Sequence, residues 1–374
     1  MSRIPLLTTS GEVANLARTL IAQPVVAVDL EADSMHSYQE KVCLLQFTWQ
    51  DETLLLDPLA GADLSPLKPF FADEAICKIF HAADYDVRCL ARDFAIEVKG
   101  LFDTMVASQL LGEERVGLAD VLKKYFAVEL DKSCQRADWS QRPLPEKMLR
   151  YAADDTRYLE RLMILLKQRL EEKGRMSWAA EEFSLLQQGR FQLQEGPLFL
   201  RLKGAALLPR RGLAVAEQLL HWRDREAERR DCPPYKVLDN KAILALAQNC
   251  PTDEIMLEQV AELVPKLRQR YGGALVREVA RALEQSPASW PVFPRGERKA
   301  RDPLAEKRLT TLKKWRAEKA EALQLEAGIL INNSLLERIA YGVPRSHGAL
   351  AALPGMKGWQ QEVLGDEILA QLGE

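Results

Sequence analysis

The sequence predicts an α/β domain, with a mixed sheet and flanking helices, followed by two all-helical modules. Three observations support this fold class. Apolar runs rich in β-branched residues, typical of buried strands, occur within the first 175 residues. Helical patterns alternate with the later of these runs, as they do in α/β sheets. The rest of the chain is helical in pattern and contains an internal repeat.

Strands are expected at 25–30, 42–48, 53–57 and 76–80, with a short fifth strand at 100–103. The first three follow one another in hairpin succession, so part of the sheet should be antiparallel. Helices are expected at 84–94, 104–111 and 145–172. The last of these begins near Pro145 and ends before Gly174. Residues 176–195 continue in a helical pattern up to a break at Gly196-Pro197.

An internal repeat appears when the sequence is shifted by 93 residues. Trp222-Arg223 then falls on Trp315-Arg316, and Pro251 falls on Pro344, without a gap. We therefore expect two related helical modules. The predicted organisation is a front domain over 1–175, a helical connector over 176–206, modules over 207–288 and 301–374, and a linker over 289–300 within the proline-rich stretch 286–303.

The composition excludes several classes of protein. Of 374 residues, 47% are apolar and 28% charged, as in ordinary globular proteins. The six cysteines show neither a CxxC pair nor zinc spacing, which favours free thiols in a reducing compartment. The N-terminus does not resemble a signal peptide, and no apolar run is long enough to span a membrane. We expect a cytoplasmic protein without a membrane partner.

Charge is unevenly distributed along the chain. Residues 1–175 carry 22 basic and 28 acidic side chains, whereas 295–319 carry 10 basic and 4 acidic ones. The acidic front half suits a cation site, and the basic back half suits a phosphate backbone. Random fluctuation of surface charge would also produce this pattern.

Three acidic signatures offer carboxylates that could meet at one site. Asp29 and Glu31 lie two positions apart at the end of a predicted strand, so they share one face. Asp86 follows another strand, at the start of a helix. Tyr151 and Asp155 lie four residues apart on the long predicted helix, again on one face. Each signature alone is weak and fits a solvated polar edge better than a functional site.

Their apolar context favours a metal site. Carboxylates packed together near a sheet repel one another and resist ionisation, and divalent cations remove that cost. Two hard cations, Mg²⁺ or Mn²⁺, about 3.5–4 Å apart would clamp a phosphodiester, activating a water at one metal and stabilising the leaving oxygen at the other. A tyrosine hydroxyl with a pKa near ~10 could orient the water but is a poor base.

Further motifs complete a family pattern. They are Leu44-Leu45-Gln46, Leu101-Phe102-Asp103-Thr104, Asp138-Trp139-Ser140-Gln141-Arg142-Pro143-Leu144 and Gly358-Trp359-Gln360. With the acidic signatures, they make the chain resemble the ribonuclease D family of the DEDD exonuclease superfamily, tyrosine subclass. The two repeats resemble helicase-and-RNase-D C-terminal (HRDC) modules. The resemblance covers almost the whole chain.

The resemblance implies a ribonuclease-H-like exonuclease domain over 1–175. It also implies 3′→5′ hydrolysis of RNA to nucleoside 5′-monophosphates, with tRNA precursors as the usual substrates. Two divalent cations, Mg²⁺ or Mn²⁺, would be the cofactors, and we expect a monomer. The implied metal ligands are Asp29, Glu31, Asp86 and Asp155, and Tyr151 would orient the water.

Two neighbouring aspartates are rivals for these roles. The family spacing favours Asp86 over Asp84. On a helix, neighbouring side chains point about 100° apart, which places Asp154 on a solvated face if Asp155 is a ligand. Asp103 follows a strand and is expected to be a buried hydrogen-bond acceptor.

Substrate contacts are less specified. His81 lies near a strand end, where it could be structural or touch the substrate. Lys132, Gln135 and Arg142 precede the long helix and could contact phosphates, although surface loops are often basic. The repeated tryptophans fit core positions better than base-stacking platforms. The arginines beside them, and the basic cluster within 295–301, are better candidates for contacts with an RNA backbone.

Two other functions remain open at this point. A DNA 3′→5′ exonuclease would use the same acids, and a catalytically idle nucleic-acid-binding protein could keep the fold. The attached repeats favour RNA over DNA, and the complete set of four acids and a tyrosine argues against an idle protein.

Overall fold

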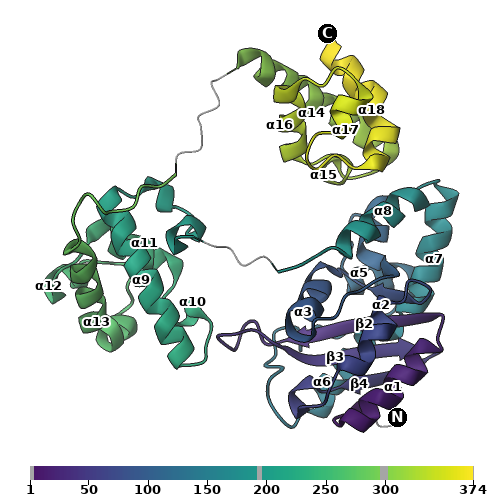
Figure 1. Ribbon diagram of the computed structural model, residues 1–374, viewed down its shortest axis with the longest axis horizontal. Coiled ribbons are helices and arrows are strands. Elements are labelled where there is room, and N and C mark those ends of the chain that lie inside the picture. Colours follow the sequence, from purple (N-terminus) through teal and green to yellow (C-terminus); the bar gives the residue numbers. More distant parts are fainter. Residues whose placement is uncertain (1–3, 192–195, 295–301, 374) are drawn as a thin grey trace. The chain divides into compact units, whose positions relative to one another are not determined.

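The structure, a computed structural model, describes residues 4–191, 196–294 and 302–373. It divides into two compact units. Unit 1 contains the sheet, residues up to 32 and from 42 to 191, and the C-terminal module. Unit 2 contains residues 33–41 and the first helical module. Figure 1 shows the sheet with helices packed on it, and the all-helical modules.

A six-stranded mixed sheet forms the centre of the front domain, in the order β1-β4-β3-β2-β5-β6. Neighbours β2, β3 and β4 pair antiparallel, as the hairpin succession predicted, whereas β5 and β6 continue the sheet in parallel. The strands are β1 (Leu6–Leu7), β2 (Val25–Ala32), β3 (Val42–Trp49), β4 (Glu52–Leu56), β5 (Cys77–Phe80) and β6 (Leu101–Asp103). All five predicted strands are present.

The helices of the front domain include three that were not predicted, α1, α2 and α5. Helix α1 begins at a capping box. The Thr9 hydroxyl accepts from the backbone nitrogen of Glu12, and the Glu12 carboxylate accepts from the backbone nitrogen of Thr9. The helices are α1 (Ser10–Ile21), α2 (Lys68–Ala72), α3 (Asp84–Phe94), α4 (Thr104–Leu111), α5 (Leu118–Phe126), α6 (Glu146–Arg157), α7 (Leu159–Glu172) and α8 (Met176–Leu186), with 3₁₀ turns η1 (Pro58–Ala60) and η2 (Ser65–Leu67).

The predicted helix over 145–172 is two helices, α6 and α7, which meet at Tyr158. Thr156 lies in the last turn of α6, fully buried. Its hydroxyl lies 2.7 Å from that of Thr48 on β3 and 3.5 Å from the carbonyl of Ala153. A threonine that bonds back to its own helix tends to bend it, and this one also ties α6 to the sheet. The helical pattern predicted for 176–195 ends at Leu186, and 192–195 lie outside the described residues.

The two helical modules are built alike, which confirms the internal repeat. Each helix of the second module begins 93 residues after its counterpart in the first. The first contains α9 (Arg210–Arg229), α10 (Pro234–Val237), α11 (Asn240–Asn249), α12 (Glu254–Glu258) and α13 (Pro265–Leu283), preceded by 3₁₀ turns η3 (Leu198–Arg201) and η4 (Ala205–Leu207). The second contains α14 (Pro303–Leu323), α15 (Ala327–Leu330), α16 (Asn333–Gly342), α17 (His347–Ala351) and α18 (Gly358–Gly373).

The tryptophans and arginines of the repeat have structural roles. Trp222 and Trp315 are buried, as predicted. The arginine after each donates to the carbonyl that ends the following short helix: Arg223 to Leu238 at 3.1 Å and Arg316 to Ile331 at 2.6 Å. These bonds fix a turn in each module, so both arginines have a structural role, and a contact with an RNA backbone stays a prediction. The basic cluster within 295–301 lies outside the described residues.

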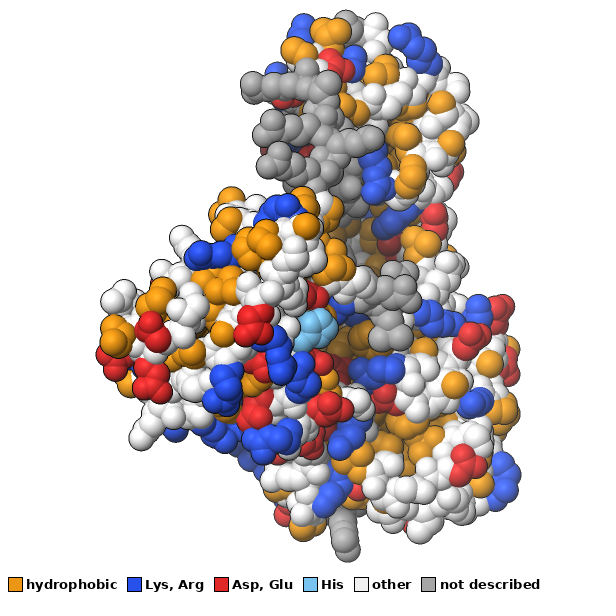
Figure 2. Space-filling model, turned by 60° about the vertical axis from the view of Figure 1, so that its left-hand side comes forward, with side chains coloured by type: hydrophobic (Ala, Val, Ile, Leu, Met, Phe, Trp, Pro, Cys, Tyr) orange, Lys and Arg blue, Asp and Glu red, His pale blue; other side chains and the backbone are white. Residues whose placement is uncertain are grey.

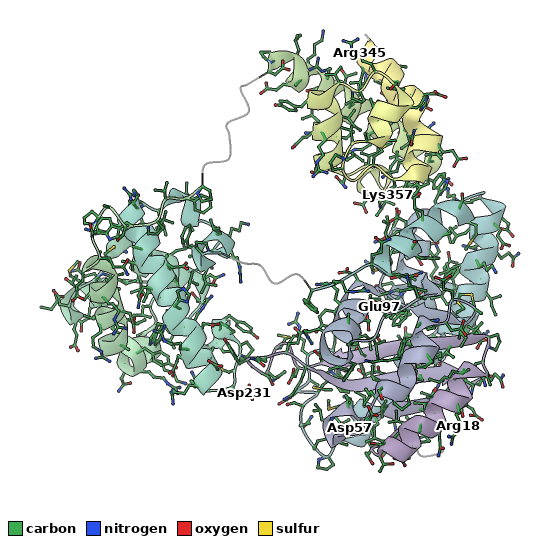
Figure 3. All side chains as sticks on the ribbon, in the orientation of Figure 1. Arg18, Asp57, Glu97, Asp231, Arg345 and Lys357 are labelled. Carbon is green, nitrogen blue, oxygen red and sulfur yellow. The ribbon has the colours of Figure 1, made fainter. Side chains whose placement is uncertain are left out.

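The second module shares a hydrophobic core with the front domain. Trp359 of α18 stacks on Trp178 of α8 with ring centroids 4.7 Å apart. The Glu181 carboxylate accepts from the backbone nitrogens of Gly358 and Trp359, at the positive start of α18. Glu182 accepts from the Trp359 indole at 2.9 Å and from Lys357, labelled in Figure 3, at 2.6 Å.

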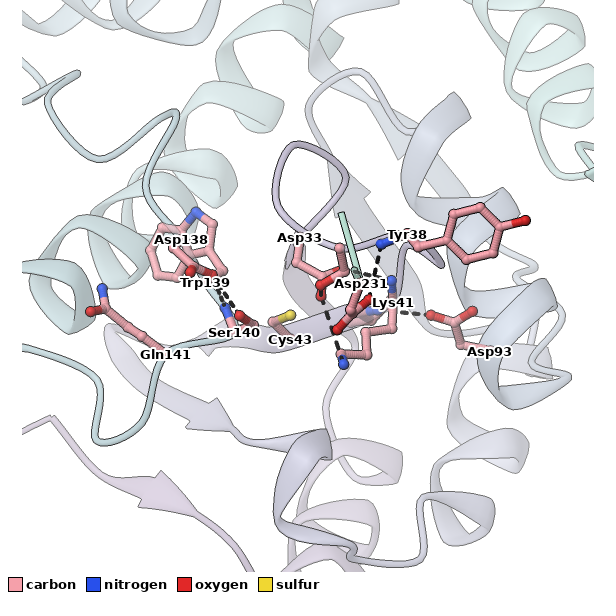
Figure 4. Close-up of polar contacts among 12 residues, drawn as sticks. Asp33, Tyr38, Lys41, Cys43, Asp93, Asp138, Trp139, Ser140, Gln141 and Asp231 are labelled. Atoms are coloured by element: carbon pink, nitrogen blue, oxygen red, sulfur yellow. Dashed lines mark hydrogen bonds and ion pairs between the residues drawn. The ribbon is translucent and has the colours of Figure 1, made fainter. Parts of the chain in front are cut away.

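The loop between β2 and β3, residues 33–41, belongs to unit 2. Its Tyr38 donates through the hydroxyl to Asp224 at 2.8 Å and through the backbone to Asp231 at 3.1 Å; Figure 4 draws Tyr38 and Asp231. At the base of the loop, the buried Asp33 accepts from the backbone of Lys41 at 2.8 Å. The loop thus ties the chain directly after β2 to the first module.

Candidate active site

The acidic residues of the three signatures come from three elements that meet on one face of the sheet. Asp29 and Glu31 lie on β2, two residues apart, opposite Gln46 and Leu44 of β3. Asp86 is in the first turn of α3 and is buried. Tyr151 and Asp155 lie on α6, which packs on β2, β3 and β4. The fold therefore brings together residues that are more than 120 positions apart in sequence.

Burial and mutual repulsion make ionisation of these carboxyls costly. Burial raises the pKa of Asp29 to about 7, although a hydrogen bond with Asp86 opposes the shift. Burial, and then the proximity of Asp29 and Asp155, raises the pKa of Glu31 well above its usual range. The pKa of Asp86 is raised by burial and by Asp29.

The pKa values of the two site residues on α6 are raised as well. Burial, and then the charges of Asp29 and Asp154, raises the pKa of Asp155 to about 8. The pKa of Tyr151 is also raised, by burial and by the charges of Asp155 and Glu31. Its hydroxyl, hydrogen-bonded to Asp155, therefore stays protonated at neutral pH. Tyr151 can donate a proton to a hydrogen bond but is not a base there.

The donor chemistry of this cluster fits divalent cations, because the carboxylate oxygens are hard ligands and crowded acids need a positive charge to ionise together. Within the described ranges, no three acidic, histidine or cysteine side chains are already gathered as a metal cage. The carboxyls are instead held by hydrogen bonds, Asp29 with Asp86 and Asp155 with Tyr151. Binding of a cation would exchange these protons for metal.

The rival aspartates lie in different surroundings. The Asp84 side chain is 61% exposed and pairs with Arg88 at 2.6 Å. The Asp154 side chain is 41% exposed and pairs with Arg157 at 2.9 Å. Both are oriented toward solvent and toward a basic partner on the same helix. This placement supports the preference for Asp86 and Asp155 as ligands.

A cavity of about 370 Å³ opens beside the acids. Asp29, Tyr151 and Asp155 contribute to its wall, whereas Glu31 and Asp86 do not. The apolar part of the wall, which the sequence did not indicate, includes Met105, Leu118, Leu130 and Leu159. The cavity therefore combines an acidic end with an apolar surface on which a nucleobase could pack.

Three of the four predicted substrate contacts line this cavity: His81, Lys132 and Gln135. His81 Nδ1 lies 2.9 Å from the Thr104 hydroxyl, and burial lowers the pKa of the imidazole, so His81 is neutral at pH 7. Lys132 lies at the rim, 3.9 Å from Asp120.

Arg142 has a different role from the one predicted. Its guanidinium forms two bonds to the Asp57 carboxylate, at 2.6 and 2.7 Å, and donates to the carbonyls of Cys43 and Trp139 at 2.7 and 2.8 Å. All of its nitrogens are occupied, and it is not in the cavity wall. We therefore correct the predicted phosphate contact: Arg142 anchors the loop before α6 to the sheet.

The start of α4 and the loop before α6, both next to the site, are held by hydrogen bonds. Asp103 accepts from the backbone nitrogens of Ala82 and Ala83 at 3.2 and 2.7 Å and caps α4, as predicted for a buried acceptor. In the loop before α6, Asp138 accepts from Ser140 beside the buried Trp139 (Figure 4). The Trp139 ring packs 5.9 Å from that of Tyr151, so this loop supports the tyrosine.

Comparison with known proteins agrees with this arrangement. Residues 5–171 match the family model of the 3′-5′ exonuclease domain, and residues 212–279 and 305–372 each match the HRDC domain. The fold and the acidic site thus define a 3′–5′ exonuclease followed by two HRDC modules.

Similar whole proteins narrow the class of exonuclease further. The chain is 31% identical to ribonuclease D of Acidiphilium cryptum, over 98% of this chain and 93% of the relative. It is 30% identical to ribonuclease D of Gluconacetobacter diazotrophicus, over 98% and 92%. The crystal structure of Escherichia coli RNase D, described as an exoribonuclease involved in structured RNA processing, superposes with a TM-score of 0.76 at 26% identity, over 100% and 99% of the two chains. The chain belongs to the ribonuclease D family and is an exoribonuclease.

Proposed function

We propose that the protein shortens RNA from its 3′ end with two divalent cations, Mg²⁺ or Mn²⁺, and releases nucleoside 5′-monophosphates. The observation that supports this most strongly is the convergence of four crowded carboxyls and a protonated tyrosine beside one cavity, whose wall includes Asp29, Tyr151 and Asp155. Asp29, Glu31, Asp86 and Asp155 would hold the cations, which supply an activated water and stabilise the leaving oxygen.

The other residues of the site position the reactants. Tyr151 stays protonated, so its hydroxyl can hold the attacking water by a hydrogen bond while another group takes the proton. The apolar wall of the cavity would hold the terminal base, with Lys132 and Gln135 near its phosphate and the neutral His81 near its sugar. The cavity volume of about 370 Å³ suits a single nucleotide.

The natural substrates are proposed to be tRNA precursors or other structured RNAs with a free 3′ end. We propose that the protein acts as a monomer in the cytoplasm. All six cysteines are free thiols, the form that a reducing compartment maintains. No helix of the described ranges has the length and apolarity needed to cross a bilayer. Basic and acidic side chains intermingle on the face drawn in Figure 2, which shows no single basic field for RNA there.

The test is incubation of a 5′-labelled RNA with Mg²⁺ or Mn²⁺, beside a DNA of the same sequence. Stepwise shortening of the RNA, with mononucleotides as products, is the expected result. Shortening of the DNA alone would favour the DNA exonuclease, and binding without any shortening would favour the idle protein. A precursor tRNA with a 3′ extension, beside the same RNA with a 3′ phosphate, tests the need for a free end.

A further inference from the structure

A buried glutamine without hydrogen-bond partners lies in the centre of the sheet. Gln46 is in β3, all eight residues of which are buried, and its side chain has no exposed surface. Among the buried side chains of the described residues, Gln46 is the only amide in which both the nitrogen and the oxygen lack a partner. Nearly all buried polar groups in proteins are paired, because an unpaired one loses its bonds to water without replacement.

The position of Gln46 places it beneath the acidic site. It is the cross-strand partner of Asp29 on β2 and of Leu55 on β4. Side chains of such partners point to the same face, with Cβ atoms about 4.5–5.5 Å apart. Two residues along β3, on that same face, Thr48 contacts Thr156 of α6. Gln46 therefore lies between the strand that carries Asp29 and the helix that carries Asp155.

Packing alone does not account for an amide here. Its neighbours along β3 on this face are Leu44, which belongs to an apolar cluster with Leu55 and Ala152, and Thr48, whose hydroxyl is bonded. A leucine or methionine would fill the same space without an unpaired polar group. The amide must therefore gain a partner in another state of the site, or it only destabilises the sheet.

We infer that Gln46 is a positioning residue for the metal ligand Asp29. This inference rests on the proposed function. Without a cation, Asp29 shares a hydrogen bond with Asp86 and leaves the amide unpaired. A carboxylate that holds a divalent cation keeps oxygen lone pairs that the cation does not use, and Gln46 Nε2, directly across the strand pair from Asp29, is an unpaired donor for them. Groups that orient metal ligands in this way commonly affect metal affinity by about 10- to 100-fold.

The test replaces Gln46 by methionine, which has a similar length but no amide. Isothermal titration calorimetry with Mn²⁺, without RNA, measures the affinity of each protein for the cation. Thermal unfolding is measured in EDTA and in saturating Mn²⁺. Gln360→Met is the matched control, because Gln360 is equally buried but donates to the Leu330 carbonyl at 2.8 Å in the second module.

We expect Gln46→Met to unfold in EDTA at or above the wild-type temperature, while its Mn²⁺ affinity falls by about 10-fold or more. Gln360→Met should unfold at a lower temperature and bind Mn²⁺ like the wild type. Mn²⁺ affinity of Gln46→Met within twofold of wild type overturns the inference. So does a loss of stability in EDTA like that of Gln360→Met, since Gln46 would then be a structural residue. A wild-type protein that binds no Mn²⁺ overturns the proposed function itself, and the inference with it.

Discussion

Replacing Asp155 by asparagine should abolish turnover and, in the absence of metal, make the folded protein more stable. The substitution keeps the shape of the side chain but removes a charge that is half-buried beside other acids. Turnover is lost because a neutral amide is a weak ligand for Mg²⁺. Stability is gained because the folded protein no longer has to accommodate that charge.

The size of the gain follows from the pKa of Asp155, about 8 in the folded chain against an ordinary value of 3.8. A group whose pKa is raised on folding contributes stability below its unfolded pKa, and this contribution is lost as pH rises toward the folded pKa. About four pH units at ~1.4 kcal/mol each set an upper limit of about 5 kcal/mol at pH 8. Because other acids share the same site, we expect a gain of about 2–5 kcal/mol at pH 8 and little at pH 4.

Urea unfolding in EDTA at pH 4, 6 and 8 measures this difference, with Asp154→Asn as the matched control on the same helix. Asp154 is half-exposed and pairs with Arg157, so its replacement should change stability by less than about 1 kcal/mol. Saturating Mg²⁺ should stabilise the wild type far more than Asp155→Asn. The reasoning is refuted if Asp155→Asn is no more stable than wild type at pH 8, or if it retains normal RNA hydrolysis.

Three further changes test other parts of the fold. Trp359→Ala removes the buried stack at the second module and should lower the free energy of unfolding in urea by about 3–5 kcal/mol, while the folded fraction still shortens RNA. A loss below about 1 kcal/mol would contradict the shared core. Arg142→Ala leaves the buried Asp57 carboxylate without its bidentate partner and should lower the free energy of unfolding by about 3–5 kcal/mol, with an unchanged KM for RNA. A raised KM in a variant that stays stable would support the predicted phosphate contact. Tyr38→Phe removes the hydrogen bond to Asp224 and should speed amide hydrogen exchange in residues 33–41 by about 10-fold, because the loop loses ~1–2 kcal/mol of local stability. Unchanged exchange would show that this bond does not hold the loop.

Patterns local in sequence were sufficient to predict five of the six strands, and together with the family resemblance they indicated the acids that meet beside the sheet. Apolar runs marked the strands, and the spacing of Asp29 and Glu31 fixed their common face. The capping box at Thr9 was also a local signal, and a closer inspection of it would have predicted α1. The break between α6 and α7 depends on the contact of Thr156 with a strand more than 100 residues earlier, so helical periodicity alone extended the helix through it.

Pairings between distant residues could not be predicted. Arg142 looked like a candidate for phosphate because the sequence does not show that Asp57 lies beside it. Gln46 was visible as one amide in an apolar run, but only the register of β2 and β3 places it opposite Asp29. The bonds of Tyr38 to the first module likewise depend on tertiary contacts across more than 180 positions.

Unit 1 is assembled from stretches of chain that unit 2 separates, and the last of them, 302–373, shares a core with 4–191. Synthesis must therefore pass through the whole first module before the body begun by the first strands can be completed. The same arrangement makes the covalent link between these stretches dispensable once they are packed. A protein cut at protease sites introduced into 192–195 and 295–301 should keep its C-terminal fragment bound to its N-terminal one. The protein is thus a natural starting point for reconstitution from separately expressed fragments.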